Sequence, residues 1–429
     1  MPVSPPVPTN VVSDGADLLA TFTDTDGTRY KARQLAGTSD WFVEGDGPVE
    51  AILAYGQSNT LAAGYADPDT LGALFPNTVV MLPCGPTWTI GDRRGVMAES
   101  FVPLEVRAGT ASLPGVMDSF AVERLARDAG RAPPGLYHFT VGVSGQRIAA
   151  FLRGRPTYEA LLDNVMSAKE VAQRYDRGFV VRAVLWTQGE NSSEGYAGHL
   201  RQLIDSLQRD IKAITGQPHP PEFMIRQTSG ADFGNTAGDS AQAQFEVARE
   251  RVGHGVTLVG PLYQGAMSDR RHYTTEARMM FADIAARALE AVRKGEVYRP
   301  VWPLTLTRSG KVIDVRFNVR GSGLRFDRDL VPASTAEGFQ FKDAAGVIPI
   351  ASVNIAAPDT VRITLNHEPA GAAATLSYAM VDEAVAKFSG PRGSLYSQED
   401  GASTVYGRMG FAVPMHPRHY AVRFILPVK

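Results

Sequence analysis

Residues 49 to about 297 alternate between short apolar runs and longer amphipathic segments, and this alternation constrains the fold more than any other feature of the chain. The clearest amphipathic segment is 196–214, where leucine and isoleucine form one stripe and charged residues the other face. Alternating strands and helices predict a parallel sheet with helices on both faces, a three-layer α/β/α domain. The expected strands are 50–55, 136–143, 179–186, 223–226 and 256–262, and the expected helices lie near 119–129, 158–174, 196–214, 239–252 and 275–294.

Segments of β type flank this region on both sides. Before it, a proline-rich arm over residues 1–10 precedes a predicted hairpin around the turn Asp24-Thr25-Asp26-Gly27. After Pro303, apolar and polar residues alternate with a period of two, as in Ile313 to Val319 and Val361 to Leu365, which predicts a β-sandwich. The expected units are a proline-rich arm with a small β element (1–48), an α/β domain (49–298) and a β-sandwich accessory domain (299–429).

The break at Pro300 and Pro303 predicts that the accessory domain folds on its own. One use of such a domain is to hold substrate or a partner beside the α/β domain. The other is purely structural packing, because domains within one chain often bury a large interface without any ligand role.

Charge, cysteine content and hydropathy exclude several classes of function. Lys and Arg number 43 against 45 for Asp and Glu, which argues against nucleic acid or an anionic membrane as partner. Cys84 is the single cysteine, so no intramolecular disulfide or thiolate metal cluster is expected, and we interpret it as a small buried hydrophobe. The sequence lacks a leader pattern and any run of about 18 apolar residues, so we expect no signal peptide, no membrane insertion and a cytoplasmic location after synthesis.

The tetrapeptide Gly56-Gln57-Ser58-Asn59 follows the first expected strand of the α/β domain. A serine there lies at the carboxyl edge of the sheet, where ligands bind in open α/β folds, and the glycine permits a turn that exposes the hydroxyl. Ser58 is therefore a candidate nucleophile. The alternative is that Ser58 or Asn59 only caps a helix.

His272 is the candidate base, because it follows the last expected strand, three residues after Asp269. This spacing allows the carboxylate to orient the imidazole, as a serine nucleophile requires. Asp269 can alternatively cap the helix that begins near Thr274. His138 is predicted to be a core residue, and the remaining histidines considered are predicted to be surface or capping residues: His199, His254, His367, His416 and His419.

Trp186-Thr187-Gln188-Gly189-Glu190 places polar side chains after a third expected strand. The oxyanion of an ester's tetrahedral intermediate needs two or three preorganised donors. The Gln188 amide and the backbone N–H groups of Ser58 and Gly145 are candidates for this oxyanion hole, with Gly142 as the alternative to Gly145.

These blocks, in this order, resemble those of SGNH hydrolases, and specifically the sialate O-acetylesterase and acetylxylan esterase branch. The resemblance spans roughly residues 49–295. It implies a flavodoxin-like SGNH fold, a triad of Ser58, Asp269 and His272, and removal of acetyl groups from carbohydrate without a metal or other cofactor. The wider family has asparagine where this chain has Gln188, and the branch usually has a Gly-Gly-Thr or Gly-Gly-Ser pattern near Gly145.

The leading hypothesis is a serine esterase, a carbohydrate O-acetylesterase that acts on a carbohydrate or surface polysaccharide. Gln57, Arg147 and Glu190 are predicted to contact substrate. The alternative is an inactive glycan-binding or structural tail protein on the same fold. Surface polysaccharide lies outside cells, whereas no signal peptide is expected in this protein. Together these suggest that the protein belongs to a phage or phage-like particle released by lysis, and that its N-terminal element contacts other virion or tail proteins.

Overall fold

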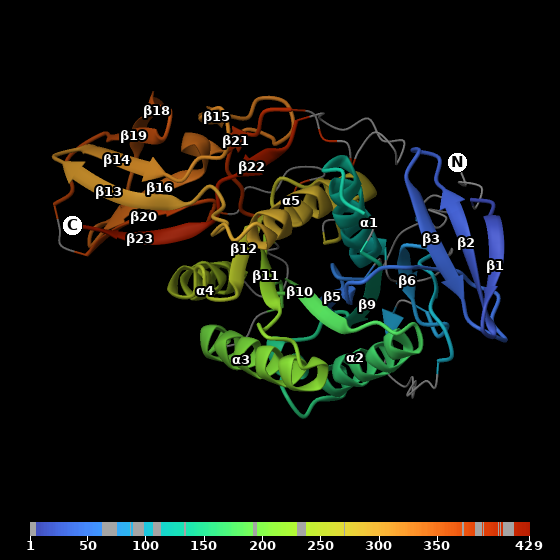
Figure 1. Ribbon diagram of the computed structural model, residues 1–429. Helices are drawn as coiled ribbons and strands as arrows, with labels where there is room; N and C mark the ends of the chain where they lie inside the picture. The colour runs from blue at the N-terminus through green and yellow to red at the C-terminus, as the bar shows by residue number, and fades with distance from the viewer. Residues whose placement is uncertain are drawn as a thin grey trace.

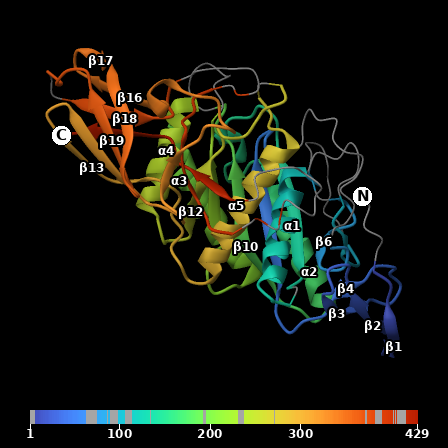
Figure 2. The same cartoon turned by 90° about the horizontal axis from the view of Figure 1, so that it is seen from above.

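The computed structural model has an α/β domain at its centre and a β region at each of two opposite ends (Figures 1 and 2). It describes residues 6–61, 75–85, 87–88, 98–105, 113–132, 134–191, 195–229, 237–269, 271–370, 373–381, 388, 390–401, 403, 405 and 416–429.

The central sheet is built from β5 (Val49–Gly56), β6 (Val79–Met81), β7 (Thr87–Trp88), β8 (Val102–Pro103), β9 (Leu136–Gly142), β10 (Phe179–Thr187), β11 (Glu222–Gln227) and β12 (Val256–Pro261). Their order in the sheet is β12-β11-β10-β5-β9-β6-β8, and β7 also pairs with β9. The strand pairs are parallel except for β6 and β8. The parallel sheet predicted from the sequence is therefore present.

Five helices cover the sheet in the described part of the chain: α1 (Leu113–Asp128), α2 (Pro156–Arg174), α3 (Tyr196–Thr215), α4 (Ala237–Glu250) and α5 (Thr275–Arg293). α1 and α5 cover one face, and α2 and α3 cover the other (Figure 1). Successive side chains of β5 point to opposite faces of the sheet. Leu53 and Tyr55 belong to the core under α2 and α3, whereas Ile52 belongs to the core under α1 and α5. The three-layer arrangement is confirmed, and each expected helix and long strand is present. Their bounds agree within a few residues except at the start of α1, which begins at Leu113, six residues before the helix expected near 119–129.

The strand order positions the site. The long strands, numbered one to five along the chain, are β5, β9, β10, β11 and β12. Across the sheet their order is β9-β5-β10-β11-β12, that is, 2-1-3-4-5. This is the flavodoxin-like order, in which the chain changes direction between the first and third strands, here β5 and β10. Ligands in such sheets bind at the carboxyl ends of the strands beside this reversal.

The N-terminal sheet consists of β1 (Thr9–Asp14), β2 (Asp17–Thr23), β3 (Arg29–Gln34) and β4 (Phe42–Val43), paired antiparallel in that order. β2 and β3 form the predicted hairpin, with Thr23 opposite Arg29 and Gly27 in the left-handed region at φ 84°. The turn is closed by a hydrogen bond from the Gly27 N–H to the Asp24 carbonyl.

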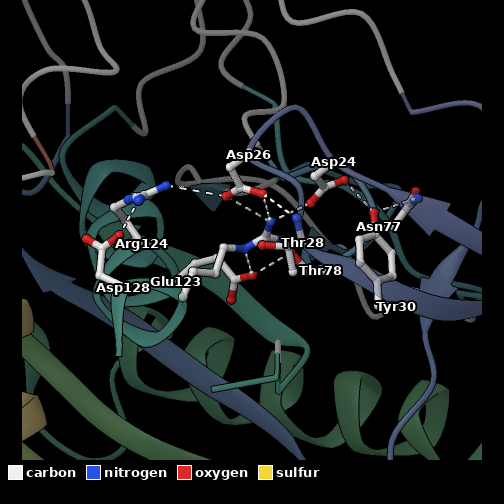
Figure 3. A network of polar contacts seen from close by, with 10 residues as sticks. Asp24, Asp26, Thr28, Tyr30, Asn77, Thr78, Glu123, Arg124 and Asp128 are labelled. Atoms are coloured by element: carbon white, nitrogen blue, oxygen red, sulfur yellow. Dashed lines mark hydrogen bonds and ion pairs between the residues drawn. The ribbon is translucent and has the colours of Figure 1, made fainter. Parts of the chain in front are cut away.

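The hairpin turn is anchored on α1 by Arg127, whose side chain is almost fully buried. Its partners Asp24, Thr78 and Glu123 lie together in Figure 3. Its guanidinium pairs with Asp24 of the turn and donates to Glu123 at 2.8 Å and to the Thr78 hydroxyl at 3.1 Å. Burial raises the pKa of Glu123, and the bond from Arg127 partly offsets that rise. Buried ion pairs therefore dock the N-terminal element on the α/β domain. They favour one docking geometry, because any other would leave a buried charge without its partner, which costs free energy.

The described residues of the C-terminal region form three antiparallel sheets, ordered β13-β14-β19-β18, β15-β21-β22 and β17-β16-β20-β23. The predicted alternation is confirmed in the two strands for which it was read from the sequence, since Ile313, Val315 and Phe317 of one and Val361, Ile363 and Leu365 of the other are buried. The elements are β13 (Pro303–Ser309), β14 (Val312–Phe317), β15 (Leu324–Phe326), the short helix η2 (Thr335–Gly338), β16 (Phe339–Asp343), β17 (Gly346–Ile348), β18 (Ile350–Ala357), β19 (Thr360–Leu365), β20 (Ala374–Tyr378), β21 (Leu395–Gln398), β22 (Arg418–Tyr420) and β23 (Phe424–Val428).

The C-terminal region packs closely against the α/β domain. Phe245 of α4 contacts Trp302 and Phe424, and the Tyr263 hydroxyl donates to the Ala421 carbonyl at 2.6 Å. One hydrophobic core cluster runs from Ala20 to Val428 and includes side chains of all three regions. The boundaries at 48 and 298 stay predictions, and the core is continuous across both.

Candidate active site

The turn that carries Ser58 depends on Gly56 at the end of β5. Gly56 has φ 151°, and a Cβ on it would lie 2.1 Å from the Thr187 carbonyl oxygen, so no other residue fits. The Gln57 N–H donates to that same oxygen at 3.0 Å, and the Leu61 N–H donates to the Ser58 carbonyl at 3.0 Å. The resulting tight turn buries Gln57 and Asn59 but leaves Ser58 partly exposed.

Glu190 lies behind this turn and holds both neighbours of Ser58. Its carboxylate accepts from Gln57 Nε2 at 2.6 Å and from Asn59 Nδ2 at 3.1 Å. Burial raises the pKa of Glu190, and the Asn59 bond and the nearby His272 act against that rise. Gln57 and Glu190, predicted to bind substrate, are only 1% and 6% exposed, so the structure gives them a place in the wall of the site instead.

Asp269 and His272 meet in the loop between β12 and α5. Asp269 Oδ2 lies 2.7 Å from His272 Nδ1, and Asp269 Oδ1 accepts the backbone N–H groups of Arg271 and His272 at 3.0 and 2.8 Å. Partial burial acts to raise the pKa of the Asp269 carboxyl, but the bonds from His272 and Arg271 outweigh it and hold the pKa below its usual value. Asp269 thus binds the imidazole, and the helix cap of α5 is Thr274.

Two side chains join the Ser58 turn to the His272 loop. Asn59 Nδ2, besides its bond to Glu190, donates to the Arg271 carbonyl at 3.2 Å. Arg278 of α5 donates to the Leu61 carbonyl at 3.0 Å and to the Tyr273 carbonyl at 2.9 Å. The residues next to Ser58 and next to His272 are therefore bonded to one another, which brings the candidate nucleophile and base to the same edge of the sheet.

Sequence reasoning did not find Arg278. The available signal was its position among apolar and small residues, Ala277, Met279 and Phe281, on a helix that is otherwise buried. A charged side chain in such a place requires partners, and here it has the two loop carbonyls.

The predicted oxyanion donors have different surroundings. No backbone carbonyl of the described residues accepts the Ser58 N–H. Gly145 lies in an exposed turn at φ 68°, while Gly142 ends β9 directly opposite Gly56. Gln188 is buried, and its amide donates to the carbonyls of Gln146 and Asn191 at 3.2 and 2.9 Å, so its hydrogens bind the two loops to each other.

Arg147, the remaining predicted substrate contact, is exposed and immediately precedes the short helix η1 (Ile148–Phe151). It follows the turn of Gly145, on the loop that Gln188 and Asn191 hold beside β10. Its position is compatible with contact to a bound ligand, and that role stays a prediction.

His138 was predicted to be a core residue and His419 a surface or capping residue, and the structure confirms only the first of these predictions. His138 is buried with Nδ1 3.0 Å from the Ser119 hydroxyl and Nε2 2.8 Å from the Thr140 hydroxyl, which confirms it as a core residue. His419 is also buried, with Nε2 3.1 Å from Glu399. Its prediction as a surface or capping residue is wrong, because the short strand β22 carries it into the interface between the C-terminal region and α5.

The other sequence expectations concern the single cysteine, metals and membranes. Cys84 is half-buried and packs against the main core. Within the described ranges, His, Cys, Asp and Glu form no group of three or more that could hold a metal ion. None of the helices in the part of the chain that the structure describes is long and apolar enough to cross a membrane.

Comparison with solved structures supports the fold. The chain is similar to the crystal structure of a carbohydrate acetylesterase from Xanthomonas citri, with TM-score 0.57 and 14% sequence identity over 97% of this chain and 86% of that one. A protein of Arabidopsis thaliana (TM-score 0.40, 18% identity) and a carbohydrate acetylesterase from Sinorhizobium meliloti (TM-score 0.32, 13% identity) each match 57% of this chain, over 98% and 99% of their own. No curated protein sequence matches the chain.

A family model described as carbohydrate esterase, sialic acid-specific acetylesterase matches residues 49–291. The match covers more than half of the chain and coincides with the α/β domain and its candidate site. The flavodoxin-like SGNH fold, the resemblance to acetylesterases and the enzyme class, a carbohydrate O-acetylesterase, are confirmed. The chain therefore belongs to the carbohydrate esterase family of sialic acid-specific acetylesterases.

Proposed function

We propose that the protein removes O-acetyl groups from a carbohydrate by a serine mechanism in which Ser58 is the nucleophile, His272 the base and Asp269 its orienting carboxylate. The observation that carries the proposal is the joining of two loops: Asn59 and Arg278 bond the Ser58 turn to the loop in which Asp269 binds His272 Nδ1. A bond at Nδ1 leaves Nε2 as the ring nitrogen for proton transfer.

In the first step Ser58 Oγ attacks the acetyl carbonyl while His272 Nε2 takes the hydroxyl proton. The backbone N–H groups of Ser58 and Gly145 stabilise the tetrahedral oxyanion. The intermediate collapses to an acetyl-serine as His272 returns the proton to the departing sugar oxygen. Water, activated by His272, then attacks the acetyl-serine, and acetate leaves as Ser58 regains its proton.

Three predicted site residues take supporting roles in this proposal. Gln57 and Glu190 position the nucleophile turn from behind, since both are buried and bonded to each other. Gln188 positions the loops after β9 and β10, because its amide hydrogens are bonded to loop carbonyls. Arg147 is assigned to substrate contact on the basis of its exposure beside the Gly145 turn.

The proposed substrate is an acetylated sugar or polysaccharide, and the proposed setting is a phage or phage-like particle. The exposed edge strand β1 supports attachment to another chain, because all six of its residues are exposed and an unpaired strand edge readily accepts a further strand. Mass spectrometry of particles purified from lysate tests this setting: the protein should co-purify with other particle proteins, and its presence only in the free fraction would contradict the idea.

The activity test compares Ser58→Ala with Ser144→Ala on p-nitrophenyl acetate and on a panel of acetylated glycans. Ser144 is an exposed serine on the neighbouring loop and serves as the matched control. Ser58→Ala should lose on the order of 10⁴-fold or more in kcat, whereas Ser144→Ala should stay close to the parent. Glycan binding without acetate release by the parent protein would instead favour the inactive glycan-binding alternative.

A further inference from the structure

Arg423, a completely buried arginine of the C-terminal region, lies against the carboxyl end of β11. Its guanidinium donates through Nη1 to the Thr228 carbonyl at 2.6 Å and through Nε to the Ala379 carbonyl at 2.8 Å. Thr228 immediately follows β11, at the carboxyl edge of the central sheet. Arg423 therefore connects the C-terminal region to the edge that carries the candidate site.

The backbone of Arg423 is held as firmly as its side chain. Gln227, also fully buried, accepts the Arg423 N–H at 2.7 Å and donates to the Arg423 carbonyl at 2.8 Å. Ala379 has φ 53°, a left-handed conformation that is costly for alanine, and its carbonyl accepts from Arg423 in that conformation. These contacts fix the guanidinium in one place, as a positioning role requires.

Thr228 transmits this position to the wall of the site. Its N–H donates to Gln244 Oε1 at 2.9 Å, and Gln244 Nε2 donates to the Gln188 carbonyl at 2.7 Å. The Thr228 side chain packs so closely on Gly189 that a Cβ there would lie 2.7 Å from the Thr228 methyl group. Gly189 directly precedes Glu190, which binds both neighbours of Ser58.

We propose that Arg423 is a positioning residue for the esterase site, acting through Thr228 on Glu190, and that the C-terminal β region is therefore part of the catalytic scaffold. This inference rests on the proposed function. It replaces the sequence-based expectation of an independently folding accessory domain whose main use is to hold polymer or a partner.

The test uses the full chain and compares Arg423→Met and Arg423→Lys with Gln242→Ala. Gln242 is the matched control because it pairs with the backbone of Ile425 in the way that Gln227 pairs with the backbone of Arg423: it accepts the Ile425 N–H at 2.7 Å and donates to the Ile425 carbonyl at 3.1 Å. This pair crosses the same interface, but it lies near solvent and makes no bond to Thr228. Steady-state kinetics on p-nitrophenyl acetate give kcat and KM, and hydrogen exchange is followed in peptides that contain residues 57–61 and 187–191.

Arg423→Met should lower kcat by about tenfold or more with KM changed less than about twofold, because the nucleophile is displaced while the substrate surface is retained. Arg423→Lys should recover part of the loss, since one ammonium can reach one of the two carbonyls but lacks the guanidinium fork. Exchange in both peptides should rise in the Met variant, and Gln242→Ala should resemble the parent in both measurements.

Parent-like kcat and exchange in both Arg423 variants would overturn the inference, as would an equal loss in Gln242→Ala. If Arg423→Met fails to fold, Gln244→Leu provides a second test: it removes the amide that accepts the Thr228 N–H and donates to the Gln188 carbonyl, so kcat should fall, and parent-like kcat would contradict the relay. If the parent protein hydrolyses no ester, the proposed function fails, and the exchange measurement still decides whether Arg423 positions the site.

Discussion

Glu190→Gln tests whether the buried carboxylate positions and activates the site. The carboxylate faces two amide donors, Gln57 Nε2 and Asn59 Nδ2, so its ionised form suits the surroundings. A glutamine places an NH₂ group against one of these donors. Gln57 can turn its amide to accept from the new group, whereas turning Asn59 would also break its bond to the Arg271 carbonyl.

The expected magnitude follows from these contacts. One hydrogen bond to a charged group is lost, which costs roughly 1.5 to 3 kcal/mol, and rotation of Gln57 recovers part of it. The charge also matters, because Glu190 and His272 interact electrostatically and the carboxylate favours the imidazolium that forms during attack. Removal of this carboxylate should therefore lower kcat by about tenfold, with KM nearly unchanged since Glu190 is buried.

The assay measures urea unfolding and esterase kinetics for Glu190→Gln beside Glu222→Gln. Glu222 is the matched control: its pKa is also raised by burial and it accepts from the Thr257 hydroxyl at 2.6 Å, but it begins β11 at the opposite edge of the sheet. Only Glu190→Gln should lower kcat. Parent-like kcat in Glu190→Gln, or the same loss in Glu222→Gln, would refute the reasoning.

Asp269→Asn should lower kcat with little change in KM, because the carboxylate binds His272 Nδ1 at 2.7 Å; equal kcat in both proteins would reduce Asp269 to a loop-stabilising residue. EDTA should leave the activity of the parent unchanged, since every proposed step uses protein groups, and inhibition that zinc reverses would contradict the mechanism. Burial lowers the pKa of His138 to about 3, so the folded state binds this proton less readily than the unfolded state and the stability is lost as the pH falls below the ordinary value of 6.5. Between about pH 7.5 and pH 5 the parent should lose about 2 kcal/mol of unfolding free energy that His138→Gln retains, and equal pH dependence in urea titrations would count against this.

Much of the fold could be predicted because the long elements carry strong periodicity. α3 buries Leu200, Leu203 and Leu207 on one stripe, and β14 buries alternate residues, so both follow from burial of one face. The strands β6, β7 and β8 have only two or three residues and show no period, and they were not predicted. β6 and β7 pair with β9, and β8 pairs with β6, so their formation depends on contacts that only the tertiary structure reveals.

The polar residues that follow the strands could also be predicted, because the carboxyl ends of parallel strands share one edge. The residues that connect them could not. Arg278 acts from within α5, and Arg423 comes from more than a hundred residues beyond the α/β domain. Their partners are backbone carbonyls, which leave no mark on the sequence of the partner residues.

The sequence also could not show in which direction the side chains of Gln57 and Glu190 point, which is why they were predicted to contact substrate. A position beside a catalytic residue in the sequence says which edge a side chain is near, but not whether it points toward solvent or into the wall. The tight turn at Gly56 directs Gln57 inward, and Gly189 directs Glu190 toward it. The two side chains bind each other, and their exposed area is small as a result.

The most direct test of the account is rapid-quench peptide mass spectrometry during turnover of p-nitrophenyl acetate by the full chain. The mechanism predicts that an acetyl group accumulates transiently on the peptide that contains Ser58, disappears as acetate is released, and is absent in Ser58→Ala. Continued release of acetate by Ser58→Ala, or a transient acetyl group on a different residue of the parent, would contradict the assignment of Ser58 as the nucleophile.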